Sequence, residues 1–181
     1  MFIRSERLFL RPAWPEDWEE LLALINDEAV VRNLAKAPWP YTVEHAQEFT
    51  RRMQDRLAPH FLVSRPTAKG EELIGCAGLA SDGRSVELGY WIARAHWGQG
   101  YATEAVRAVI DQAQTLGHRT VVAAHFADNP ASGRVLLKAG FQRTGDLHMR
   151  YSAGRHGEAL ALNYAIDLAA GPSDDVVMLA A

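Results

Sequence analysis

A glycine-rich turn at residues 97–102 has the residue types and the setting of an anion-binding site. An alternating apolar run, residues 86–92, precedes it, and a segment of helical period, residues 103–110, follows it. Backbone N–H groups at the start of a helix lack partners and lie at the positive end of its dipole. Gly98 and Gly100 carry no Cβ, so a ligand can approach the backbone closely. The turn predicts a seat for a phosphate or pyrophosphate, with a helix that merely begins in a flexible turn as the alternative.

Two common phosphate-binding loops do not fit this turn. A Walker A loop needs Lys followed by Ser or Thr after its last glycine, whereas Tyr101 and Ala102 follow here. A dinucleotide-binding fingerprint needs a third glycine, where this chain has Thr103. It also needs an acidic residue about 20 positions further on, and the strand predicted over residues 121–125 has none. The turn is therefore interpreted as a pyrophosphate seat of another kind.

A second polar turn follows the next predicted strand, residues 119–126. Asp128 or Asn129 suits the N-cap of a short helix, and Pro130 suits its first position. Gly140 suits the position just after the end of that helix. The order of strand, polar turn and helix thus occurs twice in succession.

With both blocks in place, the chain resembles the GNAT superfamily of N-acetyltransferases. It looks most similar to the branch of ribosomal-protein-alanine acetyltransferases (RimJ/RimL-like). The matching segments lie in the family's order between residues 4 and 167, and they comprise residues 8–12, 86–92, 97–105, and 129–132 with 138–141. They are specific together and not singly. The superfamily at large has Arg or Gln three residues before Gly100, whereas Trp97 stands there, as in the RimJ/RimL-like branch.

The resemblance implies acetyl-CoA as co-substrate and a direct attack of a substrate amine on its thioester. A backbone N–H near Ile92 is implied as the donor to the oxyanion. The residues implied to contact acetyl-CoA are Ile92, Trp97, Gly98, Gln99, Gly100, Tyr101, Ala102, Thr103, Asn129 and Ser132. No metal is expected, because the seven histidines show no ligand spacing and there is one cysteine.

Glu87 is the candidate base that takes the proton from the attacking amine. In a strand, Glu87, Gly89 and Trp91 share one face. Gly89 leaves space beside the carboxylate, where a substrate amine could arrive. The alternative is an ordinary solvated glutamate.

Ser132 is the candidate acid for the departing thiolate. Many GNAT enzymes use a Tyr just after the last helix, but residues 141–143 of this chain hold Phe, Gln and Arg. Helix capping alone would also explain the Asn129–Ser132 spacing. Proton transfer to bulk water is a further alternative.

Three more side chains are candidates for the acceptor pocket. Trp39 and Tyr41 could form a lid over it, with a packed loop as the equal alternative. His125 could line the cleft at the end of its strand, although a structural histidine is the plainer interpretation. Cys76 could in principle act as a nucleophile, but no His is near it in sequence, so a buried core cysteine is the preferred interpretation.

Length and charge limit the functional classes. The 181 residues predict one domain, residues 1–168, and a loose tail, residues 169–181. The net charge of −3, without a basic stripe, disfavours nucleic acid and hints at a cationic acceptor. No apolar run is long enough to span a bilayer, and the start lacks the pattern of a signal peptide, so a cytoplasmic location is expected.

The predicted fold is a mixed α/β domain. About seven strands form a mostly antiparallel twisted sheet, and about four helices flank it. The resemblance implies that this sheet is splayed to admit acetyl-CoA, and it suggests a homodimer. We expect an acetyl-CoA-dependent N-acetyltransferase that acts on a primary amine in a ternary complex. The acceptor is a protein N-terminal α-amine or a small amine (antibiotic, amino acid or polyamine), and a non-catalytic acyl-CoA-binding module is the alternative.

Overall fold

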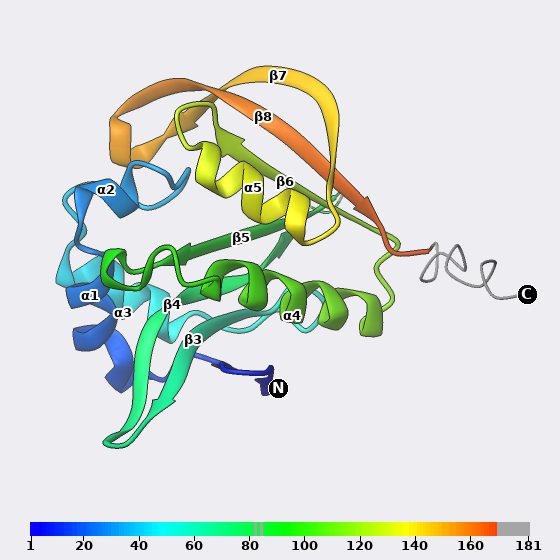
Figure 1. The fold of residues 1–181 in the computed structure, drawn as a ribbon. Helices are drawn as coiled ribbons and strands as arrows, with labels where there is room; N and C mark the ends of the chain where they lie inside the picture. The colour runs from blue at the N-terminus through cyan, green and yellow to red at the C-terminus, as the bar shows by residue number, and fades with distance from the viewer. Residues whose placement is uncertain (82, 84, 170–181) are drawn as a thin grey trace, which may run out of the picture.

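One sheet runs through the whole molecule (Figure 1). The computed structural model describes residues 1–81, 83 and 85–169. Within these residues eight strands are hydrogen-bonded in the order β1-β2-β3-β4-β5-β6-β8-β7, and every pair is antiparallel except β5–β6. The strands are β1 (Ile3–Arg4), β2 (Phe9–Arg11), β3 (His60–Thr67), β4 (Gly70–Ser81), β5 (Val86–Ile92), β6 (Thr120–Phe126), β7 (Gln142–Ser152) and β8 (Gly157–Asp167).

Five α-helices in the described residues cover the two faces of this sheet. They are α1 (Trp18–Ile25), α2 (Glu28–Val31), α3 (Val43–Arg51), α4 (Tyr101–Thr115) and α5 (Pro130–Lys138). Helices α4 and α5 lie on one face, whereas α1 and α3 lie on the other (Figure 1). The mixed, mostly antiparallel architecture is therefore confirmed. The two additional elements are β1 and α2, which are too short for a periodic pattern.

Alternation along the strands builds a separate core on each face. Phe61, Val63 and Ile74 pack with α4 and α5 in the larger cluster. Leu62 and Leu73, their neighbours in sequence, pack with α1, α2 and α3 in the smaller one. The sheet is thus covered on both faces, and a cleft that joins the two faces has to pass through a gap between strands.

That gap lies between β5 and β6. The register of this parallel pair contains one matched position, Glu87 with Val122, at the start of both strands. Beyond it the strands separate, so the ends of β5 and β6 leave an opening between the two faces. The splay that the resemblance implied is present.

Helix α3 is shorter than the sequence pattern predicts, since it ends at Arg51 instead of near Leu57. The polar side chains that follow bind their own backbone instead of continuing the helix. Asp55 accepts hydrogen bonds from the N–H groups of Leu57 and Ala58, and Gln54 accepts one from that of His60. The predicted tail, residues 169–181, lies outside the described residues except for Ala169.

Candidate active site

The glycine turn has the backbone that an anion seat requires. Gly98 and Gly100 have φ angles of +74° and +83°, in the left-handed region that favours glycine. Gly100 is the N-cap of α4, and no side chain caps this helix end. A Cβ on Gly98 would meet no atom within 4 Å. The first N–H groups of α4 are therefore left for a ligand.

Trp97 has a structural role that accounts for its departure from the common superfamily pattern. Its indole N–H donates a 2.6 Å hydrogen bond to the carbonyl oxygen of Ile92, the last residue of β5. The side chain thereby ties the turn to the end of the strand. Tyr101 is buried in the larger core, and Ala102 packs against the same core, so the start of α4 is fixed as well.

An N-terminal arginine, which the sequence analysis did not single out, holds the same turn. The Arg7 guanidinium donates to the carbonyl oxygen of Gln99 at 3.1 Å and to the carboxylate of Glu104 at 2.8 Å, and it lies over the Tyr101 ring at 4.7 Å. Burial raises the pKa of Glu104, but hydrogen bonds from Ser5 and Arg7 outweigh it, and the net shift is downward. A separation of more than 90 residues leaves no local pattern for this contact.

The second polar turn both caps a helix and faces the gap. The Asn129 side chain accepts a hydrogen bond from the backbone N–H of Ser132, as an N-cap does. The Ser132 hydroxyl lies 2.7 Å from the hydroxyl of Tyr90 on β5. Burial raises the pKa of Tyr90 to about 12, so this phenol stays protonated. Tyr90 lines the same cavity as Ser132 and was not among the candidates that the sequence suggested.

A cavity of about 1050 Å³ connects these parts through the gap in the sheet. Its wall includes the turn residues Trp97, Gly98, Gly100, Tyr101, Ala102 and Thr103, and also Glu87, Ile92, Asn129 and Ser132. On the other face of the sheet it continues between α2, α3 and β5, past Tyr41 and Trp91. We call these two parts the α4–α5 half and the α1–α3 half.

Ile92 directs its N–H into the gap. The N–H of Ala93 donates to the carbonyl of Ile74, which makes Gly75 and Ile92 a non-hydrogen-bonded antiparallel pair. The N–H of Ile92 consequently faces away from β4, toward the opening between β5 and β6. That orientation suits the oxyanion donor that the resemblance implied.

Glu87, Gly89 and Trp91 share one face of β5, and Trp91 packs against the smaller core, so this is the face that α1 and α3 cover. A Cβ on Gly89 would meet no atom within 4 Å, so the space beside the carboxylate is open. The structure adds a partner, because Arg150 on β7 binds both oxygens of Glu87 at 2.5 and 3.0 Å. An amine that approaches Glu87 therefore competes with Arg150 for the lone pairs of this carboxylate.

The three residues predicted for the acceptor pocket have different surroundings. Tyr41 lines the α1–α3 half, and burial raises its pKa to about 12. Trp39 packs against the smaller core and is not among the residues that line the cavity. His125 lines the cavity but is buried and held by Tyr164 and the carbonyl of Phe126, as a structural histidine would be.

Cys76 also borders the cavity, but its chemistry is that of a core residue. Burial raises the pKa of its thiol to about 12, so the nucleophilic thiolate is scarce at neutral pH. Within the described part of the chain, no three His, Cys, Asp or Glu side chains converge as a metal site would require.

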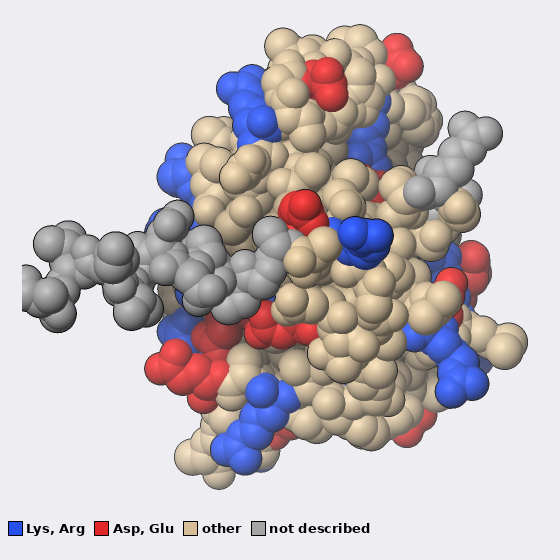
Figure 2. All heavy atoms as spheres, turned by 90° about the vertical axis from the view of Figure 1, so that its right-hand side faces the viewer, with Lys and Arg blue, Asp and Glu red and all other residues tan. Residues whose placement is uncertain are grey.

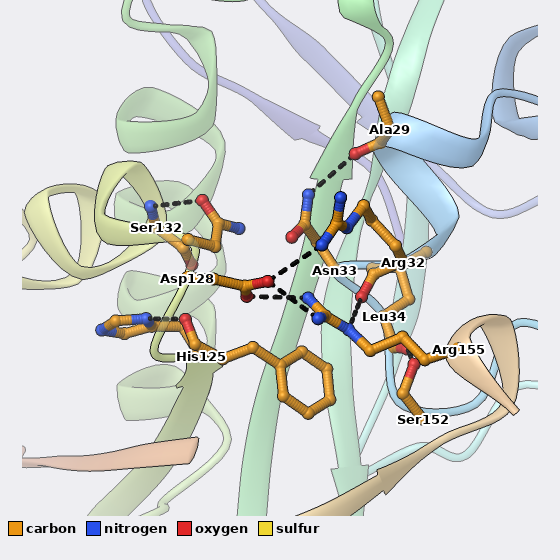
Figure 3. A network of polar contacts seen from close by, with 11 residues as sticks. Ala29, Arg32, Asn33, Leu34, His125, Asp128, Ser132, Ser152 and Arg155 are labelled. Carbon is orange, nitrogen blue, oxygen red and sulfur yellow. Dashed lines mark hydrogen bonds and ion pairs between the residues drawn. The ribbon is translucent and has the colours of Figure 1, made fainter. Parts of the chain in front are cut away.

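A network of ion pairs lies at the wall of the cavity, which Arg32 and Asp128 line (Figure 3). Asp128, just before α5, accepts two 2.8 Å hydrogen bonds from Arg155 and one of 3.0 Å from Arg32. These bonds, with Arg155 first, lower the pKa of Asp128. Ser152 also donates to the carbonyl of Leu34 at 2.7 Å. The α2 loop, the turn before α5 and the β7–β8 hairpin are thereby joined.

The charges on the surface are mixed. Figure 2 shows the face that carries the ends of α4 and β8, where acidic and basic side chains are interspersed. Among the described residues, no helix combines the length and apolar character needed to cross a membrane.

Comparison with known proteins agrees with this geometry. The model of a family described as "Acetyltransferase (GNAT) domain" matches residues 7–142. The chain is 33% identical over 153 residues to a Bacillus subtilis (strain 168) protein named "Uncharacterized N-acetyltransferase YoaA", covering 80% of this chain and 85% of that protein. It is also 30% identical over 110 residues to the ribosomal-protein-serine acetyltransferase of Escherichia coli (strain K12), covering 57% and 62% of the two chains.

Solved structures share the fold. The crystal structure of a GNAT-family acetyltransferase from Bacillus anthracis superposes with a TM-score of 0.78 at 24% identity, covering 93% of this chain and 99% of that one. Spermidine N-acetyltransferase from Vibrio cholerae, in complex with CoA and spermine, superposes with a TM-score of 0.72 at 22% identity, covering 90% and 96%. The chain belongs to the GNAT acetyltransferase family, and it is an acyltransferase.

Proposed function

We propose that this protein transfers the acetyl group of acetyl-CoA to a primary amine by direct attack in a ternary complex. The observation that carries the proposal is the cavity through the β5–β6 gap, which joins the glycine turn to Glu87. The open space at Gly98 and the free N–H groups of α4 fit a pyrophosphate. Bound acetyl-CoA would supply the thioester, and the residues of the chain would supply its surroundings.

Each proposed role follows from position. Glu87 takes the proton that the amine must lose in order to attack. The N–H of Ile92 stabilises the negative oxygen that forms when the amine nitrogen adds to the thioester carbonyl. As the C–S bond breaks, the Ser132 hydroxyl donates to the departing thiolate, and Tyr90 holds that hydroxyl in place.

The acceptor of this proposed reaction is one of two kinds. Similarity to the ribosomal-protein-serine acetyltransferase favours a protein N-terminal α-amine and the RimJ/RimL-like branch. A small amine is the second candidate, and the α1–α3 half of the cavity, which lies between α2, α3 and β5, favours it.

The substitution Glu87→Gln tests the proposed mechanism. It removes the base but keeps the size of the side chain, so we expect kcat to fall ~10²-fold while the affinity for acetyl-CoA is retained. Release of free CoA thiol measures turnover, and calorimetric titration measures the affinity. Unchanged kcat would exclude Glu87 as the base, and a parent protein that binds acetyl-CoA without turning over any amine would support the non-catalytic module.

We also propose a homodimer that forms through the β7–β8 edge of the sheet. Leu147, Met149 and Tyr151 share one face of the edge strand β7, and each is more than half exposed. Light scattering after size exclusion should give about twice the chain mass, and Met149→Lys should shift it toward the monomer. A parent protein that is monomeric at all concentrations tested would contradict this assembly.

A further inference from the structure

Glu87 and Arg150 place opposite charges side by side on the wall of the α1–α3 half. The two side chains come from β5 and β7, which are separated in the sheet by β6 and β8. Arg150 reaches Glu87 along a face where β6 and β8 present the small residues Ala124 and Ala161, and all four residues line the cavity. Both charged side chains remain accessible, with 31% of Glu87 and 24% of Arg150 exposed.

A ligand that carries one kind of charge cannot satisfy this pair. An incoming ammonium would compete with Arg150 for Glu87 and leave the guanidinium without its carboxylate. An incoming carboxylate would compete with Glu87 for Arg150 and leave the Glu87 carboxylate without its guanidinium. A molecule with an ammonium and a carboxylate replaces both partners at once, so neither protein charge is left unpaired.

The remaining charges of this half do not favour a polycation. Asp128 is already bound by Arg155 and Arg32. Lys36, Arg52 and Glu48 also line the cavity, and none of them forms an ion pair with any residue that the structure describes, so cations outnumber carboxylates two to one among these three. Burial lowers the pKa of His60 on the same wall, and the positive charge of Arg52 lowers it further. The overall charge of −3 is therefore a poor guide to this half of the cleft.

We propose that the acceptor is a small amino acid, whose carboxylate binds Arg150 while its amine is received by Glu87. The proposal rests on the function proposed above and names its substrate class. Binding of the carboxylate draws Arg150 away from Glu87, so the base becomes available when the correct acceptor arrives. The ammonium gives one proton to Glu87, and the amine nitrogen then forms its bond to the thioester carbonyl carbon. As the C–S bond breaks, the second proton that the nitrogen loses goes to the thiolate sulfur, so the products are the amide and the free thiol of CoA.

The test compares amino acids with the matched amines that lack the carboxylate. The panel contains the common amino acids, their methyl esters and decarboxylated counterparts, spermidine and an alanine-initiated peptide. We expect at least one amino acid to exceed its ester and its decarboxylated partner by ~10-fold or more in kcat/KM. Release of CoA thiol is the readout, and mass spectrometry identifies the acetylated product.

Two arginine variants make the test specific. Arg150→Gln should raise KM for the amino acid ~10-fold or more. It should not raise KM for the decarboxylated amine, because that amine no longer competes with the guanidinium for Glu87. Arg143→Gln is the matched control, because Arg143 lies on the same strand but does not line the cavity. Thermal melts of both variants show whether each is folded.

The outcomes separate this inference from the proposed function. Equal turnover of amines with and without a carboxylate, or preference for spermidine or the peptide, would overturn the amino-acid class alone. Binding of acetyl-CoA without turnover of any amino acid would overturn it as well. Failure to bind acetyl-CoA, together with no turnover of any amine, would overturn the proposed function.

Discussion

Two glycines that face each other across β4 and β5 have different reasons to be glycine. Gly78 and Gly89 are register partners. A Cβ on Gly78 would lie 2.4 Å from the Cα of His60, whereas a Cβ on Gly89 would meet nothing within 4 Å. Gly78 is therefore required by packing, and Gly89 keeps open the space next to Glu87.

Alanine at each position should distinguish the two. Gly78→Ala forces backbone apart and should cost roughly 2–3 kcal/mol in the free energy of unfolding. Gly89→Ala should leave stability within ~0.5 kcal/mol but raise KM for the acceptor, because the methyl group enters its space. Urea unfolding and steady-state kinetics measure both. A destabilised Gly89→Ala with an unchanged KM would contradict this assignment.

Ser132 and Tyr90 form a second pair that can be tested residue by residue. Ser132→Ala removes the donor to the thiolate and should lower kcat ~10²-fold with little change in affinity for acetyl-CoA. Tyr90→Phe keeps the ring but frees the Ser132 hydroxyl, so a smaller loss of kcat is expected. If Ser132→Ala retains full kcat, proton transfer to water replaces the proposed role of Ser132.

At the scale of elements, the N-terminal segment holds the start of α4 through Glu104. The pKa of Glu104 is lowered in the folded protein from an ordinary value of 4.5. The unfolded chain therefore takes up a proton first as the pH falls below 4.5, and stability declines over that range. Above that range the contribution is fully present.

Glu104→Gln should remove the share of the acid-induced loss of stability that comes from protonation of Glu104. The difference in urea midpoint between pH 7 and pH 4 should become smaller in the variant than in the parent protein, because glutamine does not titrate. Asp111→Asn, on the same helix but without an ion pair among the described contacts, is the control. An unchanged pH dependence in Glu104→Gln would show that the contact of Glu104 with Ser5 and Arg7 does not contribute to the loss of stability in acid.

The sequence predicts those strands and helices whose signal lies within one continuous stretch of residues. Period and capping residues located all five longer interior strands and the helices α1, α3, α4 and α5. Strand β1 and helix α2 have two and four residues, too few to show a period. The end of α3 was also missed, because Asp55 and Gln54 satisfy a loop that apolar spacing does not reveal.

At the scale of the whole molecule, the parts of the site that are local in sequence could be predicted, and the parts that join distant residues could not. The glycine turn and the Asn129–Ser132 quartet are continuous in sequence, so their chemistry can be inferred from it. The Glu87–Arg150 and Arg7–Glu104 contacts join residues 63 and 97 positions apart. Such contacts depend on the strand order, and the placement of β8 between β6 and β7 has no local signature.

In the molecule as a whole, the splayed gap between β5 and β6 joins the two halves of the cavity. The α4–α5 half contains the glycine turn, and the α1–α3 half contains the proposed acceptor groups. The central claim is that the turn binds the pyrophosphate of acetyl-CoA. Gly98 and Gly117 offer a matched pair, because both have left-handed φ angles and open surroundings, but Gly117 lies at the far end of α4.

The most direct measurement is a thermal melt of the parent protein, Gly98→Ala and Gly117→Ala, each with and without acetyl-CoA and with ATP and NAD as controls. A ligand at 100 times its Kd adds ~2.7 kcal/mol, which should raise the Tm of the parent by roughly 5–10 °C. Both variants should lose similar stability to backbone strain, but only Gly98→Ala should lose the shift with acetyl-CoA. No shift in the parent, or a larger shift with ATP or NAD, would contradict the central claim.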